Sequence, residues 1–309
     1  MTEILRKIIR YSLLFSGALC ALSARAQTES DALMIPRHYI CTDLSFMHTA
    51  WSSYWEGTFK RTNQNLGTVS SNTYSLMENY GITNNLNLLV SVPYITTRAT
   101  AGTLAPHQGL QDLMASLKLV AFKVRFKNSQ FRLLTTLTGS LPLSNYEADF
   151  QPLSIGFHSK SLMGRVMADY QYAHFFITGS AAYVYRDNIF IDRNSYYTTT
   201  EHYTNEVFMP DQLLLAVRTG LRTHTLIAEA VVGQMNTLGG FDIRKNDMPF
   251  PGNRMNQTTA GLNLKYSSTY IQGLEASAGA DYVVAGRNVG QGTMLHVGIN
   301  YLADLSRKH

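Results

Sequence analysis

Apolar and polar residues alternate along most of the chain. In Asp112–Phe122, Leu117 and Leu119 share one face of the expected strand, while Ser116 and Lys118 share the other. A period of two is typical of a β-strand with one apolar and one polar face. The same period predicts nine strands whose apolar faces carry no charge, and these begin near Asp112, Phe131, Leu162, Phe175, Gln212, Leu226, Thr259, Leu274 and Leu295.

Three weaker strands are predicted ahead of these nine, over Ile40–Thr49, Asn72–Tyr80 and Leu86–Thr97. The total of about twelve is an even number, as is usual for bacterial outer-membrane barrels. Short connections such as Thr83–Asn85 and Lys123–Ser129 alternate with long ones such as Asp187–Pro210, which is the pattern of periplasmic turns and external loops. The sequence therefore predicts an all-β, antiparallel barrel of about 12 strands, with both termini in the periplasm.

Alternation alone does not decide which face lies inside, because a soluble barrel of the lipocalin type would place its apolar face inward. The expected strands of about ten to thirteen residues match tilted membrane strands better than the shorter strands of soluble sheets. Charged residues make up only 15% of the chain, against about 25% in soluble domains. Tyrosines near the strand ends predict an aromatic girdle: Tyr94, Tyr170, Tyr172, Tyr183, Tyr185, Tyr266, Tyr282 and Tyr301. These features favour a transmembrane barrel with a polar interior.

The first residues indicate secretion. Basic residues precede an apolar run, Tyr11–Leu22, and Ala24-Arg25-Ala26 supplies a cleavage site for signal peptidase. We predict a signal peptide over residues 1–26 and an outer-membrane barrel domain over residues 27–309; an uncleaved anchor is the alternative. Removing residues 1–26 takes away four basic residues and one acidic residue, so the formal net charge falls from +5 to +2. That balance gives no argument for a nucleic-acid partner.

One stretch resembles a known family. Glu78–Tyr94 reads ENYGITNNLNLLVSVPY, and it is followed by Gly109–Leu113 and by Leu117-Lys118-Leu119. This order is similar to that of the outer-membrane meta-pathway phenol-degradation proteins, although Gln111 replaces a usual glycine. The resemblance covers about residues 78–119 and implies a β-barrel that transports hydrophobic compounds.

The polar faces, if inward, carry charges of both signs into the lumen. A strongly ion-selective pore would use a ring of one sign, whereas here the expected lumen residues are five acids and six bases. Either these charges pair across the interior and partly plug a narrow barrel, or they orient a polar solute. The eleven candidates are Asp112, Lys118, Arg132, Arg165, Asp169, Arg218, Arg222, Glu229, Lys265, Glu275 and Asp281.

Candidate catalytic groups are sparse. His158-Ser159 is an adjacent pair without the surroundings expected of an outer-membrane lipase. One long loop carries Asp187, Asp192, Glu201 and His202, which solvated loop charge explains more simply than a protease site. The nine histidines show no spacing of metal ligands. We therefore predict no enzyme activity and no cofactor.

The predicted role is passive uptake of small, hydrophobic or aromatic solutes across the outer membrane of a Gram-negative cell. A structural barrel without transport is the alternative, followed by an outer-membrane hydrolase. The expected partners are outer-membrane lipid, a small-molecule solute and the barrel-assembly machinery during insertion.

Overall fold

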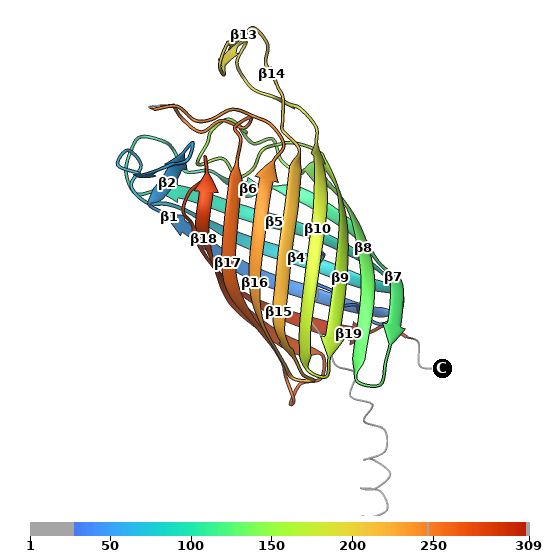
Figure 1. Cartoon of the computed structure of the whole chain (residues 1–309). Helices are drawn as coiled ribbons and strands as arrows, with labels where there is room; N and C mark the ends of the chain where they lie inside the picture. Colours follow the sequence, from blue (N-terminus) through green and yellow to red (C-terminus); the bar gives the residue numbers. More distant parts are fainter. Residues whose placement is uncertain (1–27, 246, 307–309) are drawn as a thin grey trace, which may run out of the picture.

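The computed structural model describes residues 28–245 and 247–306. The predicted signal peptide lies outside this part, so its cleavage stays a prediction. Twelve long antiparallel strands form a single wall (Figure 1). They are β1 (Tyr39–Trp51), β4 (Val69–Thr83), β5 (Leu86–Ala99), β7 (Asp112–Arg125), β8 (Ser129–Pro142), β9 (Ser161–Tyr172), β10 (Phe175–Arg186), β15 (Gln212–Arg222), β16 (Leu226–Thr237), β17 (Asn256–Ser267), β18 (Leu274–Arg287) and β19 (Thr293–Asp304).

The wall closes on itself. β1 pairs with β19 on one side and with β4 on the other, and β4 pairs with β5. Every long strand therefore has two hydrogen-bonded neighbours, so that no strand edge is left to face lipid, as a membrane requires. The predicted twelve-strand antiparallel barrel is confirmed, and the three weaker strands correspond to β1, β4 and β5.

The outer face of the barrel is apolar. Leu262, Val297 and Ile299 are 66%, 54% and 60% exposed, and all eight tyrosines predicted for the girdle are exposed. The inner face buries charge instead, since Lys118 and Asp169 are each 0% exposed. A soluble barrel would show the opposite arrangement, so the lipocalin-like alternative is wrong. The described residues contain no helix long and apolar enough to cross a membrane.

A β-bulge in β7, between Val120 and Phe122, changes which side chains face inward. Before the bulge, Lys118 faces the lumen; after it, Lys123 pairs with Arg132 and Arg125 with Gln130. Directly opposed residues share a face, so these later odd-numbered positions also point inward. The sequence placed residues 123–129 in a turn, and this is wrong for Lys123–Arg125, because the extra residue interrupts the period of two.

Shorter strands build the external loops. They are β2 (Ser53–Glu56) with β3 (Phe59–Thr62), β11 (Ile189–Phe190) with β14 (Glu206–Val207), and β12 (Tyr196–Tyr197) with β13 (Glu201–His202), while β6 (Gln108–Leu110) extends the sheet beside β5. The loop that carries β13 and β14 projects beyond the end of the barrel (Figure 1). Ile189, Val207 and Met209 are buried together near its base.

The apolar outer face predicts the effect of a buried charge. Leu262 lies in the middle of β17, so Leu262→Arg should destabilise the folded barrel in lipid vesicles by about 2–4 kcal/mol. Urea unfolding followed by tryptophan fluorescence measures this loss. Tyr203→Arg is the control, because Tyr203 is 88% exposed in the external loop. Equal stability of the two variants would contradict the lipid-facing assignment of β17.

Candidate functional site

Thr28–Pro36, the first part of the chain that the structure describes, folds into the barrel, and we call this segment the N-terminal plug. Its Ala32 is fully buried against Leu134 and Met167 on the inner face. Its Leu33 packs with inward-facing apolar residues of β10 and β16, namely Phe176 and Ile227. One side of the plug therefore packs against the wall formed by β8, β9, β10 and β16.

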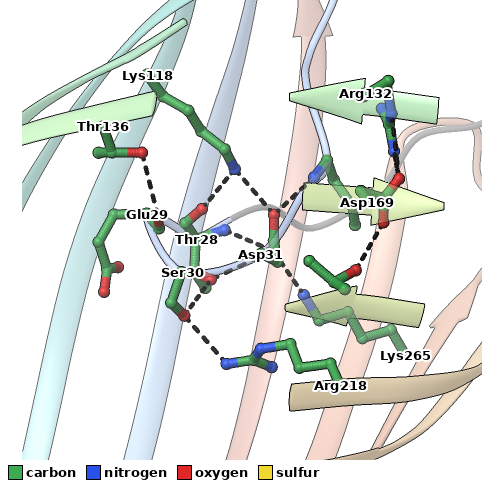
Figure 2. Close-up of polar contacts among 12 residues, drawn as sticks. Thr28, Glu29, Ser30, Asp31, Lys118, Arg132, Thr136, Asp169, Arg218 and Lys265 are labelled. Carbon is green, nitrogen blue, oxygen red and sulfur yellow. Dashed lines mark hydrogen bonds and ion pairs between the residues drawn. The ribbon is translucent and has the colours of Figure 1, made fainter. Parts of the chain in front are cut away.

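Asp31 anchors the plug to two opposite walls of the barrel (Figure 2). Its carboxylate lies 3.0 Å from the Lys118 ammonium on β7 and 3.2 Å from the Lys265 ammonium on β17. In the strand order, β7 and β17 are six steps apart in either direction around the twelve long strands. A single carboxylate therefore connects diametrically opposed sides of the lumen.

The local fold of the plug completes the Asp31 site. The backbone N–H groups of Thr28 and Leu33 donate to the carboxylate at 2.8 and 2.9 Å. The Lys118 ammonium also donates to the Thr28 carbonyl oxygen at 2.8 Å. Burial alone would raise the pKa of the Asp31 carboxyl, but Lys118, Lys265 and these N–H groups hold that pKa below its ordinary value. Asp31 is therefore an ionised carboxylate inside the barrel.

Further contacts hold the two ends of the plug. Arg218 donates to the Ser30 hydroxyl oxygen at 3.2 Å, and Thr136 donates to the Glu29 carbonyl oxygen at 3.5 Å. At the other end, a side chain at Gly81 would overlap the Pro36 carbonyl group. Glycine at position 81 is thus required by the close approach of the plug to β4.

A second charged network centres on Asp169 of β9. Arg132 and Arg222 donate to its two carboxylate oxygens at 2.6 and 2.8 Å, and Thr178 donates at 2.6 Å. The Arg222 guanidinium also lies 3.6 Å from the centre of the Phe176 ring, which contacts the plug. This network stiffens the wall against which the plug packs.

The remaining predicted lumen residues also lie on the inner face, mostly with partners. Arg218 pairs with Glu229 at 2.7 Å, and Asp281 lies 3.8 Å from His296. Tyr146 donates to Asp112 at 2.6 Å, and Ser267 donates to Glu275 at 2.7 Å. Arg165 is 8% exposed. The structure brings Lys118, Lys265 and Arg218 together on the plug; that the eleven residues line a path for solute stays a prediction.

A cavity of about 330 Å³ lies on the other side of the plug. Its walls come from the plug and from β1, β4 and β15–β19. The lining combines the apolar side chains of Met47, Met77 and Val231 with charged and polar groups. The polar part of the lining includes Ser30, Asp43, Glu229, Asn263, Lys265, Asp281 and His296.

The residues considered for catalysis take other roles. The Ser159 hydroxyl donates to the Asp187 carbonyl oxygen at 2.6 Å, while the His158 ring lies edge-on to Tyr146. His202 bonds to the Thr198 hydroxyl and stacks on Tyr196. Within residues 28–245 and 247–306, no three His, Cys, Asp or Glu side chains are grouped to hold a metal ion.

Comparison with solved structures supports the fold described above. No protein family and no curated protein matches the amino-acid sequence. Among solved structures, an outer-membrane channel from Pseudomonas putida F1 is similar over 90% of this chain and 100% of that chain, with a TM-score of 0.71 and 13% identity. The protein is an outer-membrane β-barrel.

Two further solved structures match at lower TM-scores. The translocator domain of the autotransporter NalP from Neisseria meningitidis matches 96% of this chain and 97% of its own, with a TM-score of 0.47 and 11% identity. The KdgM porin matches 84% of this chain and 98% of its own, with a TM-score of 0.41 and 7% identity. Membership of the meta-pathway phenol-degradation family stays a prediction.

The Asp31 anchor predicts how the plug is released. Asp31→Asn leaves Lys118 buried without its charge partner, a change that costs about 3–5 kcal/mol in buried ion pairs. We expect a cysteine placed at Ala32, in a Cys41→Ala background, to react with an aqueous maleimide at least about tenfold faster in the Asp31→Asn variant. Glu29→Gln is the matched control, since it removes a neighbouring negative charge. Equal rates in the two variants would contradict the anchor.

The lowered pKa of Asp31 predicts the response of the plug to acid. The pKa of the Asp31 carboxyl is lower when the plug is docked than when the plug is free. Ionised Asp31 therefore stabilises docking at pH values above the pKa of the free state, near 3.8. This stabilisation is lost as the pH falls through the pKa of the docked state. Labelling at position 32 should therefore be as slow at pH 5 as at pH 7. A cysteine at the exposed position 203 corrects for the intrinsic reactivity of the thiol. Release of the plug already at pH 5 would contradict this assignment.

Proposed function

We propose that this barrel is a passive channel that carries small, hydrophobic or aromatic solutes across the outer membrane. The cavity beside the N-terminal plug is the observation that supports this role. Its volume of about 330 Å³ suits a single aromatic ring, and it lies at the lower end of the range for ligand pockets. A barrel that only stabilised the membrane would have no need of such a space.

The cavity lining suits a ring that bears a polar group. Met47 and Met77 supply flexible thioether side chains, which adapt to the shape of an apolar ligand. Asn263, Lys265 and His296 supply hydrogen-bonding groups on the facing strands. A solute with both characters would contact each part of the lining.

The plug would control passage. On one side it packs against β8, β9, β10 and β16, so a solute has the cavity side of the lumen, along β1, β4 and β17–β19, as its route. Release of Asp31 from Lys265 would widen that side, because Lys265 both lines the cavity and holds the plug. Solute would then move down its own gradient, with no covalent chemistry and no cofactor.

A structural barrel without transport is the second candidate, and the bridge from Lys118 through Asp31 to Lys265 favours it. Such a cross-brace would stiffen the closed wall. In that case loss of Asp31 would lower the stability of the barrel without opening any path for solute.

Solute flux into vesicles separates these functions. With the refolded protein in the membrane, resorcinol should enter faster than arabinose, after subtraction of protein-free vesicles. Met77→Trp should reduce resorcinol entry several-fold by filling the cavity. Leu76→Trp is the matched control, because the neighbouring Leu76 is 46% exposed on the outer face. No flux above protein-free vesicles, even in the Asp31→Asn variant, would favour the structural barrel.

A further inference from the structure

The periplasmic end of the lumen carries a second, strongly basic pocket. Its volume is about 530 Å³, and it lies at the short turn between β7 and β8. We call it the basic mouth pocket. Its lining includes Lys123, Arg125, Lys127, Gln130, Arg132 and Gln171. None of these six residues is acidic.

The bulge in β7 creates this pocket. Without the extra residue, Lys123 and Arg125 would share the outer face with Leu117 and Leu119, where a charge in contact with lipid is costly. With it, Lys123 lies opposite the inward-facing Arg132. The irregularity therefore directs two additional cations into the mouth of the lumen.

These cations lack acidic partners. Arg132 is paired with Asp169, but Lys123, Arg125 and Lys127 form no ion pair with any acidic side chain within the described residues. The Arg125 guanidinium makes a long bond of 3.3 Å to the Gln130 amide oxygen, a contact that an anion could replace. Elsewhere in the lumen, Lys118, Lys265 and Arg218 each have a carboxylate partner. The basic mouth pocket is thus an uncompensated concentration of positive charge.

The position of the pocket relates it to the plug. Arg132 and Asp169 lie two residues along their strands from Leu134 and Met167, which pack against Ala32 of the plug. The pocket therefore lies just to the periplasmic side of the contact that closes this part of the lumen. A solute at the mouth would meet the pocket next to the plug.

We propose that the basic mouth pocket binds small oxyanions, carboxylates or phosphates, at the periplasmic end of the channel. Guanidinium and ammonium groups donate charge-assisted hydrogen bonds to such oxygens, and the Gln171 amide stands beside them. If the barrel is the proposed channel, the solutes that it carries include aromatic or small organic acids. This consequence for transport rests on the proposed function. Binding itself does not depend on flux.

Equilibrium dialysis tests the binding without transport. The full-length mature protein in zwitterionic lipid vesicles is dialysed at low salt against labelled benzoate, inorganic phosphate or benzyl alcohol. We expect benzoate or phosphate to bind in preference to the neutral benzyl alcohol. The pair Lys123→Gln with Arg125→Gln should weaken that binding at least about tenfold. The matched control is Lys60→Gln with Lys160→Gln, which removes the same charge from the external loops.

The charge-conserving pair Lys123→Arg with Arg125→Lys should retain binding. It shows whether a loss of binding in the glutamine pair comes from the lost charge or from misfolding. Binding that is unchanged in the glutamine pair, or no stronger for the two anions than for benzyl alcohol, would overturn the proposal. Loss of anion binding when phosphatidylglycerol is added to the vesicles would mean that a lipid headgroup occupies the pocket, and would overturn the assignment to solutes. If oxyanions bind while the vesicle assay shows no flux, the proposed channel function fails and the pocket stands.

Discussion

The attachment of one carboxylate to two opposite walls determines how the lumen is organised. Asp31 enters a space lined by the positive charges of Lys118, Lys265 and Arg218, and its ionised form is stabilised there. The position of the plug follows from this contact together with the packing of Ala32 and Leu33 on the wall formed by β8, β9, β10 and β16. The cavity on the other side is the space that the anchored plug leaves empty. The partial closure of the lumen by the plug and the cavity beside the plug therefore have the same physical cause, the attachment of Asp31.

The surrounding membrane explains why such a polar interior is tolerated. Lipid takes the place that water has around a soluble protein, so the apolar residues lie outside and the charges satisfy one another within. Asp169 illustrates the requirement, because Arg132, Arg222 and Thr178 all donate to its carboxylate. Buried charges are stable only when they are paired in this way. The interior thus combines hydrogen-bonded charges with the small apolar clusters in which Ala32 and Leu33 of the plug pack on the inner wall.

The wall of the barrel could be predicted from sequence, because each strand repeats the same alternation and closure needs nothing else. Alternation put Lys118, Asp169 and Lys265 on the polar face, and the strand length, the low charge content and the tyrosines near the strand ends predicted that this face lies inside. Three features could not be predicted. The plug has no periodic pattern, since Asp31 is placed by lysines far away in the chain. The inward direction of Lys123 depends on a bulge, which the sequence does not mark. The pairing of Arg132 with Asp169 depends on the register between β8 and β9.

The separation along the chain between Asp31 and its partners has a consequence for the order of folding. Lys118 is 87 positions away and Lys265 is 234 positions away. Contacts between such distant residues form late, because the chain between them must first be ordered. Both lysines take up their final positions only when the wall between them is complete. The plug can therefore make both of its Asp31 contacts only after β7, β17 and the strands between them have been ordered.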